Sequence, residues 1–340
     1  MTRSESKPTR SARTRALLFL IATLAIGALL IVAMTWFVIG SAPRAQAVAV
    51  ASSITVSEYV ALPDDDAYPA ALAIGSDGAL YTGSYQSGAV WAISRAGVLN
   101  EIPGSRERIG SVTGLDVAPD GALYILDRIT PLDAKGAVVW VYADGELNAV
   151  AEIPNDDALG LVLPEDIALD SAGAIYISDR KTGRVWRYTA ASKALGVFWQ
   201  LPCGETCAAT GLAYDPGNDA MLITDSETDT VYRVPVGDAS GRAERLFIDE
   251  ADSGYGMDGI TVSAEGEIFL ALLAWNRVAK LQDGKLIMLA RDFRGASDVA
   301  YDADSDRLFV SNWNQFSLGF GTRPQLPFAL DVIDLSPESD

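Results

Sequence analysis

One phrase recurs six times between residues 70 and 312: a small or polar residue, an apolar pair, an Asp- or Gly-rich turn, and then a β-rich run. The copies begin at Ala70, Thr113, Glu165, Thr210, Asp258 and Ser297, at intervals of 43, 52, 45, 48 and 39 residues. A period of about 40–50 residues with several short strands per copy is typical of a β-propeller, in which each repeat forms one four-stranded blade. The sequence therefore predicts an all-β fold, a six-bladed β-propeller.

The last copy lacks a strand, and an unassigned strand precedes the first copy. The final repeat ends after the run that begins at Phe328, whereas a β-rich run begins at Ile54, ahead of the first phrase. Pairing of these two segments would complete the sixth blade and leave no exposed sheet edge at the seam. We therefore expect the propeller to occupy residues 54–340, with the N-terminal strand closing the ring.

The first 53 residues predict a membrane-directed segment rather than part of the propeller. Residues 1–15 carry five basic side chains and one acidic one, and residues 16–40 form an uncharged apolar run long enough to cross a bilayer. This charge distribution predicts a basic cytoplasmic tail, a single transmembrane helix, a tether over residues 41–53 and a propeller outside the cytoplasm. A signal peptide cleaved near Ala47, giving a secreted protein, remains the alternative.

Composition excludes several classes of chemistry. The chain has no histidine, so Ser-His and Cys-His nucleophilic pairs and His-ligated zinc are absent. The net charge of −19 argues against a nucleic-acid partner. Cys203 and Cys207 are the only cysteines; outside the cytoplasm a local disulfide is favoured over a metal site.

The first residues of the six phrases are the best candidates for a site, because each blade's first strand lines the central channel. Five of the six carry a side-chain oxygen, and two of these, Glu165 and Asp258, are carboxylates. Oxygen ligands that converge from several strands suit Ca²⁺ or Mg²⁺. By strand alternation we expect Asp166 and Asp298, which follow the ring positions, to point elsewhere.

The phrase from Asp258 to Gly266, with its parallel at Thr210-Gly-Leu, resembles the SMP-30/gluconolactonase/luciferin-regenerating-enzyme-like superfamily. The resemblance implies a six-bladed propeller that hydrolyses lactones or related esters with a divalent metal, commonly Ca²⁺. It implies Asp258 as metal ligand and catalytic base, with Glu165 and Thr210 as further ligands. The family's first-blade glutamate falls on Ala70, which cannot ligate; we expect Glu165 to compensate.

Other residues are candidates for substrate contacts at the rim of the channel. They are Thr113, Ser297, Trp275, Trp313, Phe320 and Arg323, the last two within a long loop over residues 315–327. Several copies also resemble NHL repeats, which implies a non-catalytic alternative: a sensor or scaffold that binds a small ligand or a cell-envelope partner. The sequence leaves the choice between hydrolase and binding propeller open.

Overall fold

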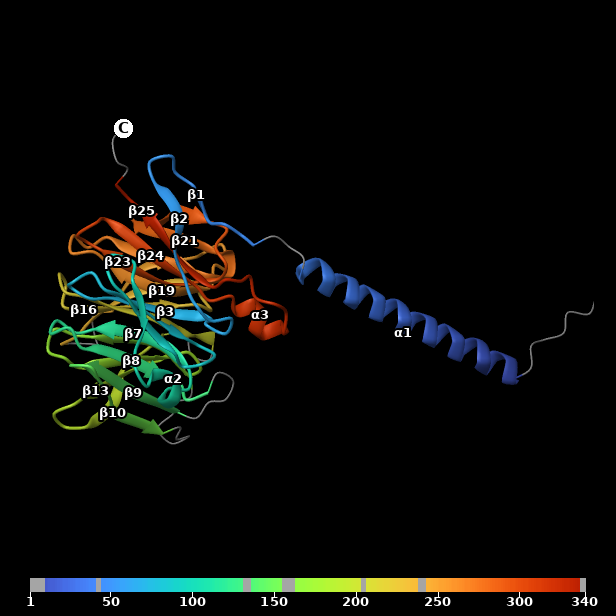
Figure 1. Cartoon of the computed structure of the whole chain (residues 1–340), viewed down its shortest axis with the longest axis horizontal. Helices are drawn as coiled ribbons and strands as arrows, with labels where there is room; N and C mark the ends of the chain where they lie inside the picture. The colour runs from blue at the N-terminus through green and yellow to red at the C-terminus, as the bar shows by residue number, and fades with distance from the viewer. Residues whose placement is uncertain are drawn as a thin grey trace, which may run out of the picture. The chain divides into compact units, whose positions relative to one another are not determined.

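The fold was analysed in a computed structural model. It describes the chain except residues 1–9, 41–43, 131–135, 155–162, 203–205, 238–242 and 337–340. The chain divides into two compact units, which are described separately: Met1–Arg44 with Phe316–Pro324, and Ala45–Gln315 with Gln325–Asp340. Figure 1 gives the order of the elements along the chain.

The larger unit is a β-propeller of six sheets, each beginning at the channel with its first strand, as the repeats predicted. Blade 1 contains β3 (Pro69–Ile74), β4 (Leu80–Ser84), β5 (Val90–Ile93) and β6 (Leu99–Glu101); blade 2 contains β7 (Val112–Val117), β8 (Leu123–Asp127), β9 (Gly136–Ala143) and β10 (Glu146–Pro154); blade 3 contains β11 (Pro164–Leu169), β12 (Ile175–Asp179), β13 (Arg184–Thr189) and β14 (Ala194–Gln200). Blade 4 contains β15 (Ala209–Asp215), β16 (Ala220–Asp225), β17 (Thr230–Pro235) and β18 (Glu244–Ile248); blade 5 contains β19 (Met257–Val262), β20 (Ile268–Leu272), β21 (Arg277–Gln282) and β22 (Lys285–Arg291); blade 6 contains β23 (Ala296–Asp302), β24 (Arg307–Asn312) and β25 (Ala329–Asp334). Two short helices, α2 (Ser105–Arg108) and α3 (Gln315–Phe320), and a 3-10 turn, η2 (Leu273–Trp275), lie in connections.

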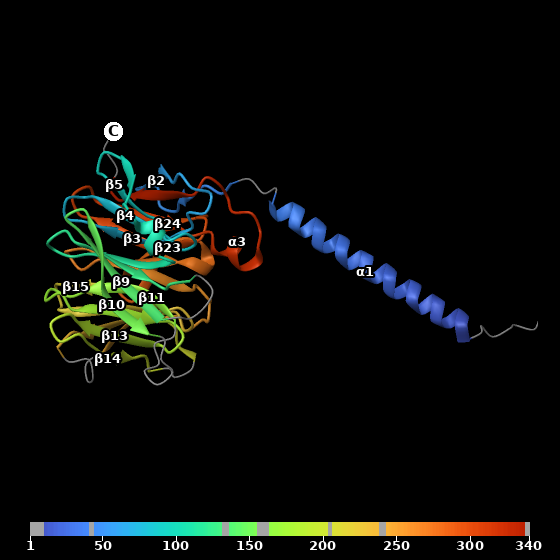
Figure 2. The same ribbon diagram turned by 60° about the horizontal axis from the view of Figure 1, so that its bottom comes forward.

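The N-terminal strand closes the ring, which confirms that prediction. Strand β2 (Thr55–Ala61) pairs antiparallel with β25 and completes blade 6, so that the two ends of the propeller meet in one sheet. Figure 2, turned from Figure 1, shows β2 near the first and last blades. A further strand, β1 (Val48–Ala49), lies within the segment expected to be a tether and adds a fifth strand to blade 5 through β22.

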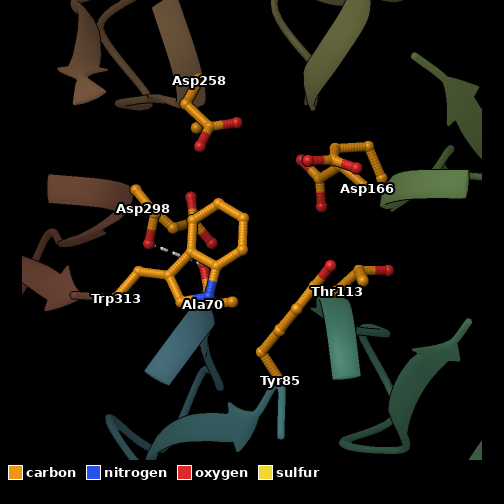
Figure 3. Close-up of a pocket in the computed structure, with 10 residues that line it drawn as sticks. Ala70, Tyr85, Thr113, Asp166, Asp258, Asp298 and Trp313 are labelled. Atoms are coloured by element: carbon orange, nitrogen blue, oxygen red, sulfur yellow. Dashed lines mark hydrogen bonds between the residues drawn. The ribbon is translucent and has the colours of Figure 1, made fainter. Parts of the chain in front are cut away.

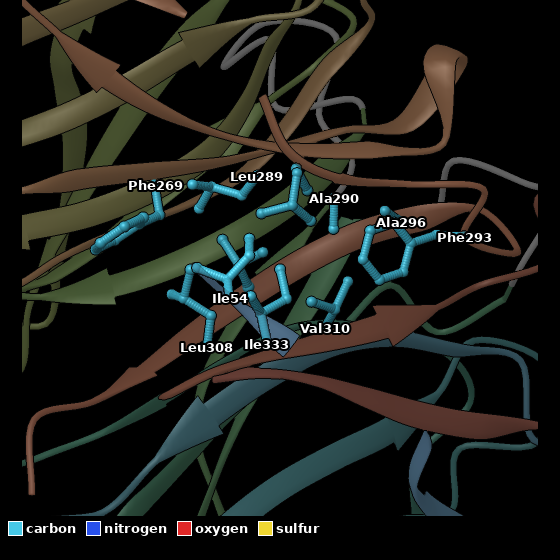
Figure 4. Packing of buried hydrophobic residues seen from close by; sticks show 12 residues of the cluster. Ile54, Phe269, Leu289, Ala290, Phe293, Ala296, Leu308, Val310 and Ile333 are labelled. Atoms are coloured by element: carbon cyan, nitrogen blue, oxygen red, sulfur yellow. The ribbon is translucent and has the colours of Figure 1, made fainter. Parts of the chain in front are cut away.

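The junction of blades 5 and 6 is a packed aliphatic and aromatic core. Ile54 packs there with Phe269 from β20, Phe293, Val310 from β24 and Ile333 from β25 (Figure 4). All five side chains are buried. A buried side chain of this size contributes on the order of 1.5–3 kcal/mol. The residue before β2 therefore anchors the N-terminal strand through packing as well as through its hydrogen-bond ladder.

Every inner strand contains an irregularity of pairing at the same place. The register between first and second strands shifts at or next to Ala70, Thr113, Glu165, Thr210, Asp258 and Ser297. A β-bulge places two residues opposite one and turns the strand locally. Because all six bulges coincide with the first residue of the repeated phrase, the sequence repeat marks the end of the channel at which the inner strands begin.

The smaller unit contains α1 (Arg10–Gly40), a helix of 31 residues. Its segment Leu17–Thr35 has a mean hydropathy of 2.8 and is not buried by other parts of the chain, so it is long and apolar enough to cross a membrane. A signal sequence would meet the same test. The structure therefore confirms an N-terminal apolar helix. It does not distinguish a membrane anchor from a signal sequence that is cleaved.

Candidate functional site

The first ring of the site consists of the residues that open the six phrases. Five of them, Ala70, Thr113, Glu165, Asp258 and Ser297, line one pocket at the mouth of the channel (Figure 3). Thr210 does not line it, because its hydroxyl donates to the carbonyl of Met257 at 2.9 Å and contacts the Thr224 hydroxyl at 3.0 Å. The sequence register thus located the mouth, whereas the hydrogen bonds of Thr210 withdraw that side chain.

A second set of equivalent positions contributes Tyr85 and Trp313 to the pocket, and of its members the sequence analysis named only Trp313. Its members follow directly on the last residue of each second strand: Tyr85, Arg128, Arg180, Ser226, Leu273 and Trp313. The rings of Tyr85 and Trp313 meet edge to face at 4.8 Å between centroids, and both residues line the pocket. All six occupy the same position of the repeat, so the register that aligned the first ring could also have found the second.

Asp166 and Asp298 line the pocket, so the prediction that they point elsewhere is wrong. The reason is the bulge: it breaks the alternation of β11 and β23 just where these residues lie. The residue at the same position one blade earlier is glycine in both cases, Gly114 and Gly259. A Cβ on Gly259 would lie 2.1 Å from Oδ1 of Asp298, and one on Gly114 would lie 2.7 Å from Oδ1 of Asp166. Each carboxylate therefore fills the space that a glycine of the preceding blade leaves.

These carboxylates connect neighbouring blades. Asp298 accepts hydrogen bonds from the backbone N–H of Leu72 at 2.7 Å and of Val299 at 2.8 Å. Asp166 accepts from Leu212 and Ile167 in the same way. Burial raises the pKa of Asp298 to about 8, although both backbone N–H groups oppose the shift. Burial, and then the charge of Asp298, raise the pKa of Asp166 well above its usual value.

A buried ion pair lies between the first ring and this second set. The Arg128 guanidinium, 4% exposed, pairs with Glu165, 8% exposed. It also donates to the carbonyl of Pro164 through Nε at 3.1 Å and through Nη2 at 2.8 Å, and to the Tyr85 hydroxyl at 2.8 Å. Arg180 lies 3.7 Å from the other oxygen of Glu165. Glu165 is thereby neutralised and fixed in place by protein cations.

Three polar groups at the mouth are left without a hydrogen-bond partner among the described residues. Thr113 Oγ1 and Trp313 Nε1 are buried and unpaired, and no hydrogen bond reaches the carboxylate of Asp258. Burial, and then the negative charge of Glu165, raise the pKa of Asp258 well above its usual value; Arg180 opposes this. Unpaired buried polar groups are costly, so their convergence points to a ligand or ordered water. The cavity that they surround holds about 20 Å³, room for a water molecule.

The expected metal site was tested against this geometry. Ca²⁺ takes six to eight oxygen ligands, in general with several carboxylates. Of the three expected ligands, Glu165 is paired with Arg128, Thr210 is turned away, and only Asp258 is free. Among the residues that the structure describes, no three Asp, Glu or Cys side chains are placed to hold a metal ion. The donor set does not fit a divalent cation, and the metal site stays a prediction.

The remaining expected residues are dispersed. Ser297 lies at the mouth, where its hydroxyl donates to the Ala70 carbonyl at 2.9 Å. Trp275 is 38% exposed, meets Tyr255 edge to face, lies under the Arg277 guanidinium, and does not line the pocket.

The loop and cysteine candidates are placed only in part. Phe320 and Arg323 belong to the segment grouped with α1, and the side chain of Phe320 lies outside the described part. Cys207 is disulfide-bonded; its one available partner in the sequence, Cys203, lies outside the described residues.

Comparisons with known proteins agree with this architecture. Solved structures with the same fold include a gluconolactonase from Xanthomonas campestris (TM-score 0.60, 15% identity, covering 86% of this chain and 99% of that one). Virginiamycin B lyase from Staphylococcus aureus, solved with quinupristin, aligns with a TM-score of 0.58 at 14% identity over 83% of this chain and 99% of that one. A luciferin-regenerating enzyme aligns with a TM-score of 0.61 at 14% identity over 82% and 94%. At these identities the likeness shows the fold alone, and no curated protein sequence matches the chain.

The family assignment rests on the sequence itself. The model of the SMP-30/gluconolactonase/LRE-like region matches residues 117–312, which run from the end of the first strand of blade 2 to the end of the second strand of blade 6. This match covers more than half of the chain and contains Glu165, Thr210 and Asp258. The chain belongs to the SMP-30/gluconolactonase/LRE-like family.

Proposed function

We propose that the channel mouth hydrolyses a small lactone or ester, with Asp258 as the general base. The observation that carries this proposal is the convergence of three unpaired polar groups, Asp258, Thr113 and Trp313, on a cavity of water size. Hydrolysis needs a water, a base and a donor to the carbonyl oxygen, and these groups supply the base and two donors. Family membership and the gluconolactonase-like fold support the substrate class.

The proposed reaction uses only groups of the chain. Asp258 accepts a proton from the water as the water oxygen attacks the carbonyl carbon, and the raised pKa of Asp258 makes it a stronger base than an ordinary carboxylate. The indole N–H of Trp313 and the hydroxyl of Thr113 donate to the carbonyl oxygen, which becomes negative. The C–O bond of the ring then breaks, and Asp258 returns its proton to the leaving alkoxide. The products are a hydroxyl and a carboxylic acid.

The ion pair holds the site in shape rather than reacting. Arg128 fixes Glu165 and the Tyr85 ring, which in turn packs against Trp313. The negative charge of Glu165 also contributes to the raised pKa of Asp258. In this proposal Arg128, Glu165 and Tyr85 are positioning residues, and a divalent ion would have to displace Arg128 from Glu165 before it could bind there.

The test is turnover by the full chain in a nonionic detergent, measured with a panel of γ- and δ-lactones and a pH indicator. We expect Asp258→Asn to lower kcat by at least about a hundredfold. Trp313→Phe keeps an aromatic side chain but removes the indole N–H, and we expect it to lower kcat rather than to raise KM. Asp65→Asn, at an exposed carboxylate, is the matched control. Unchanged turnover in Asp258→Asn would refute the proposal.

A second candidate is a binding propeller without turnover. It is favoured by the small volume of the cavity, about 20 Å³, and by the ion pair that occupies Glu165. The same unpaired groups would then recognise a ligand that carries both an acceptor and a donor. Calorimetric binding of a lactone that is lost in Asp258→Asn, with no product by chromatography, would select this function.

We propose further that α1 anchors the propeller in a membrane with the basic N-terminus in the cytoplasm. The apolar length of Leu17–Thr35 and the basic residues that precede it support this arrangement. Membrane fractionation with N-terminal sequencing tests it: an intact N-terminus in the membrane fraction is expected. A mature chain that begins near Val48 would indicate a cleaved signal sequence.

A further inference from the structure

A second and much larger cavity lies in the central channel, on the other side of the Asp166 and Asp298 layer from the mouth. It has a volume of about 520 Å³ and is lined by the later halves of the six inner strands and the turns that follow them. Pockets for small molecules usually fall between about 300 and 1,000 Å³. This cavity, here called the lower chamber, is therefore of ligand size, whereas the mouth is not.

Small side chains keep the lower chamber open. At the position two residues beyond Asp166, which faces the channel in every blade, the six residues are Ala73, Asp116, Ala168, Ala213, Thr261 and Ala300. Five of the six are alanine or threonine. The layer above contains two carboxylates, in blades 3 and 6, and four residues that are glycine or alanine. Larger side chains at these positions would fill the axis, so the composition of two consecutive layers produces the cavity.

The wall of the lower chamber is aliphatic. It is formed by leucine, isoleucine and valine from all six inner strands: Leu72, Ile74, Leu115, Val117, Ile167, Leu169, Leu212, Ile260, Val262 and Val299. Such a wall favours a hydrocarbon group, at roughly 25 cal/mol for each Å² of apolar surface removed from water. A purely inorganic ion would gain nothing from it.

The closed end of the lower chamber is acidic. Asp116, Asp166 and Asp298 line it, and none of its lining residues is a lysine or arginine. Each of the three carboxylates accepts two backbone N–H groups, as Asp116 does from Val117 at 2.8 Å and from Leu169 at 2.7 Å, but no described side-chain cation reaches them. Asp170, nearer the opening, differs because it is paired with Arg187. Each carboxylate oxygen keeps a free lone pair that can accept from a ligand.

When they are ionised, acidic groups in a channel with aliphatic walls attract a positive charge more strongly than they would in water, because the local dielectric is low. Burial raises the pKa of all three groups, and a bound cation opposes this shift by favouring their ionised form. We propose that the lower chamber binds an amphiphilic organic cation, a primary alkylammonium, with its ammonium group on Asp116, Asp166 and Asp298 and its hydrocarbon chain along the aliphatic wall. The three N–H donors of an ammonium group match the free lone pairs of three carboxylates. This site is separate from the mouth and does not depend on the proposed hydrolysis.

The experiment is calorimetric titration of the full chain with n-hexylammonium in a nonionic detergent at about pH 9, which lies above the raised pKa of Asp116 and of Asp298 and below that of an alkylammonium group. Two probes of matched size, n-hexanol and hexanoate, separate the contribution of charge from that of the hydrocarbon chain. We expect one site for n-hexylammonium, and binding at least tenfold weaker for n-hexanol and hexanoate. Equal binding of n-hexanol, or no binding of n-hexylammonium, would overturn the proposal.

Two variants locate the ligand. Thr261→Phe introduces a ring into the lower chamber without changing a carboxylate, and we expect it to abolish binding of n-hexylammonium. Thr55→Phe, at an exposed position of β2, is the control and should bind n-hexylammonium like the unmodified chain. Asp116→Asn removes one charge, and we expect it to weaken n-hexylammonium at least tenfold, whereas Asp65→Asn should not. Undiminished binding by Thr261→Phe would place the ligand elsewhere and refute the assignment. Lactone turnover, measured in parallel on Thr261→Phe, should persist.

Discussion

The Arg128–Glu165 ion pair allows the sharpest test of how the mouth is built. Both side chains are at least nine-tenths buried, and removal of one partner from such a pair leaves an uncompensated charge that costs about 3–5 kcal/mol. Arg128→Met also removes the donors to Pro164 and Tyr85. For a domain of this size about 1 kcal/mol corresponds to roughly 2–4 °C in Tm, so we expect Arg128→Met to lower Tm by about 6–20 °C.

A double-mutant cycle completes this test. Glu165→Gln should also destabilise, and the double variant should lose at least about 1 kcal/mol less than the sum of the single variants, because neither charge is then left unpaired. The assay is thermal unfolding of the full chain in detergent, followed by far-ultraviolet circular dichroism. Arg95→Met is the control, since Arg95 is 46% exposed where it pairs with Asp304, and should cost under about 1 kcal/mol. A cost of that size for Arg128→Met, or strict additivity in the cycle, would refute the reasoning.

Three further outcomes follow from the same geometry. Burial raises the pKa of Asp116 from 3.8 to about 7, so the protonated form is favoured in the folded state. Its contribution to stability is full below about pH 4 and is lost as the pH rises toward 7, so Asp116→Asn should flatten the fall in Tm between about pH 4 and pH 7. Gly259→Ala would place a Cβ 2.1 Å from Asp298 Oδ1 and should cost on the order of 1–3 kcal/mol in urea unfolding, whereas Gly196→Ala, with nothing within 4 Å, should change stability by less than about 1 kcal/mol. Removal of divalent ions with EDTA should leave both Tm and any lactone turnover unchanged; a rise in Tm on adding Ca²⁺ that disappears in Asp258→Asn would show that the donor set does rearrange around a metal.

The fold was predictable from the sequence because the repeat carries its own register. The phrases at Thr113 and Glu165 differ in most residues, yet both place a buried apolar residue two positions later and a turn five positions later, and both form inner strands. Ring closure was predictable for a related reason: a blade with three strands leaves an open edge that Ile54 and the strand after it can cover. Neither inference needed the contacts of any individual side chain.

The sequence predicted the site residues whose location depends only on their position in the repeat. Thr113, Glu165, Asp258 and Ser297 meet at the mouth because the strands that carry them converge there. Thr210 does not, because its hydroxyl finds a carbonyl in the next blade, a contact that no pattern along the chain encodes.

The direction in which a side chain points was predicted less well than its position along the strand. Simple alternation assigned Asp166 to the wrong side because a bulge inserts a residue at that point. Arg128 was missed because nothing in its local sequence shows that it would meet Glu165, which lies 37 residues later.

The two short strands that precede the first repeat also determine how the propeller would bear a load. In a chain that keeps α1 as an anchor, any pull between membrane and propeller enters through Val48–Ala49 on blade 5 and then through β2 on blade 6. A pull along the length of β2 acts on its whole ladder of bonds to β25 at once instead of opening one bond after another. The ladder between β2 and β25 that closes the ring would therefore also be the contact that resists a force applied through the anchor.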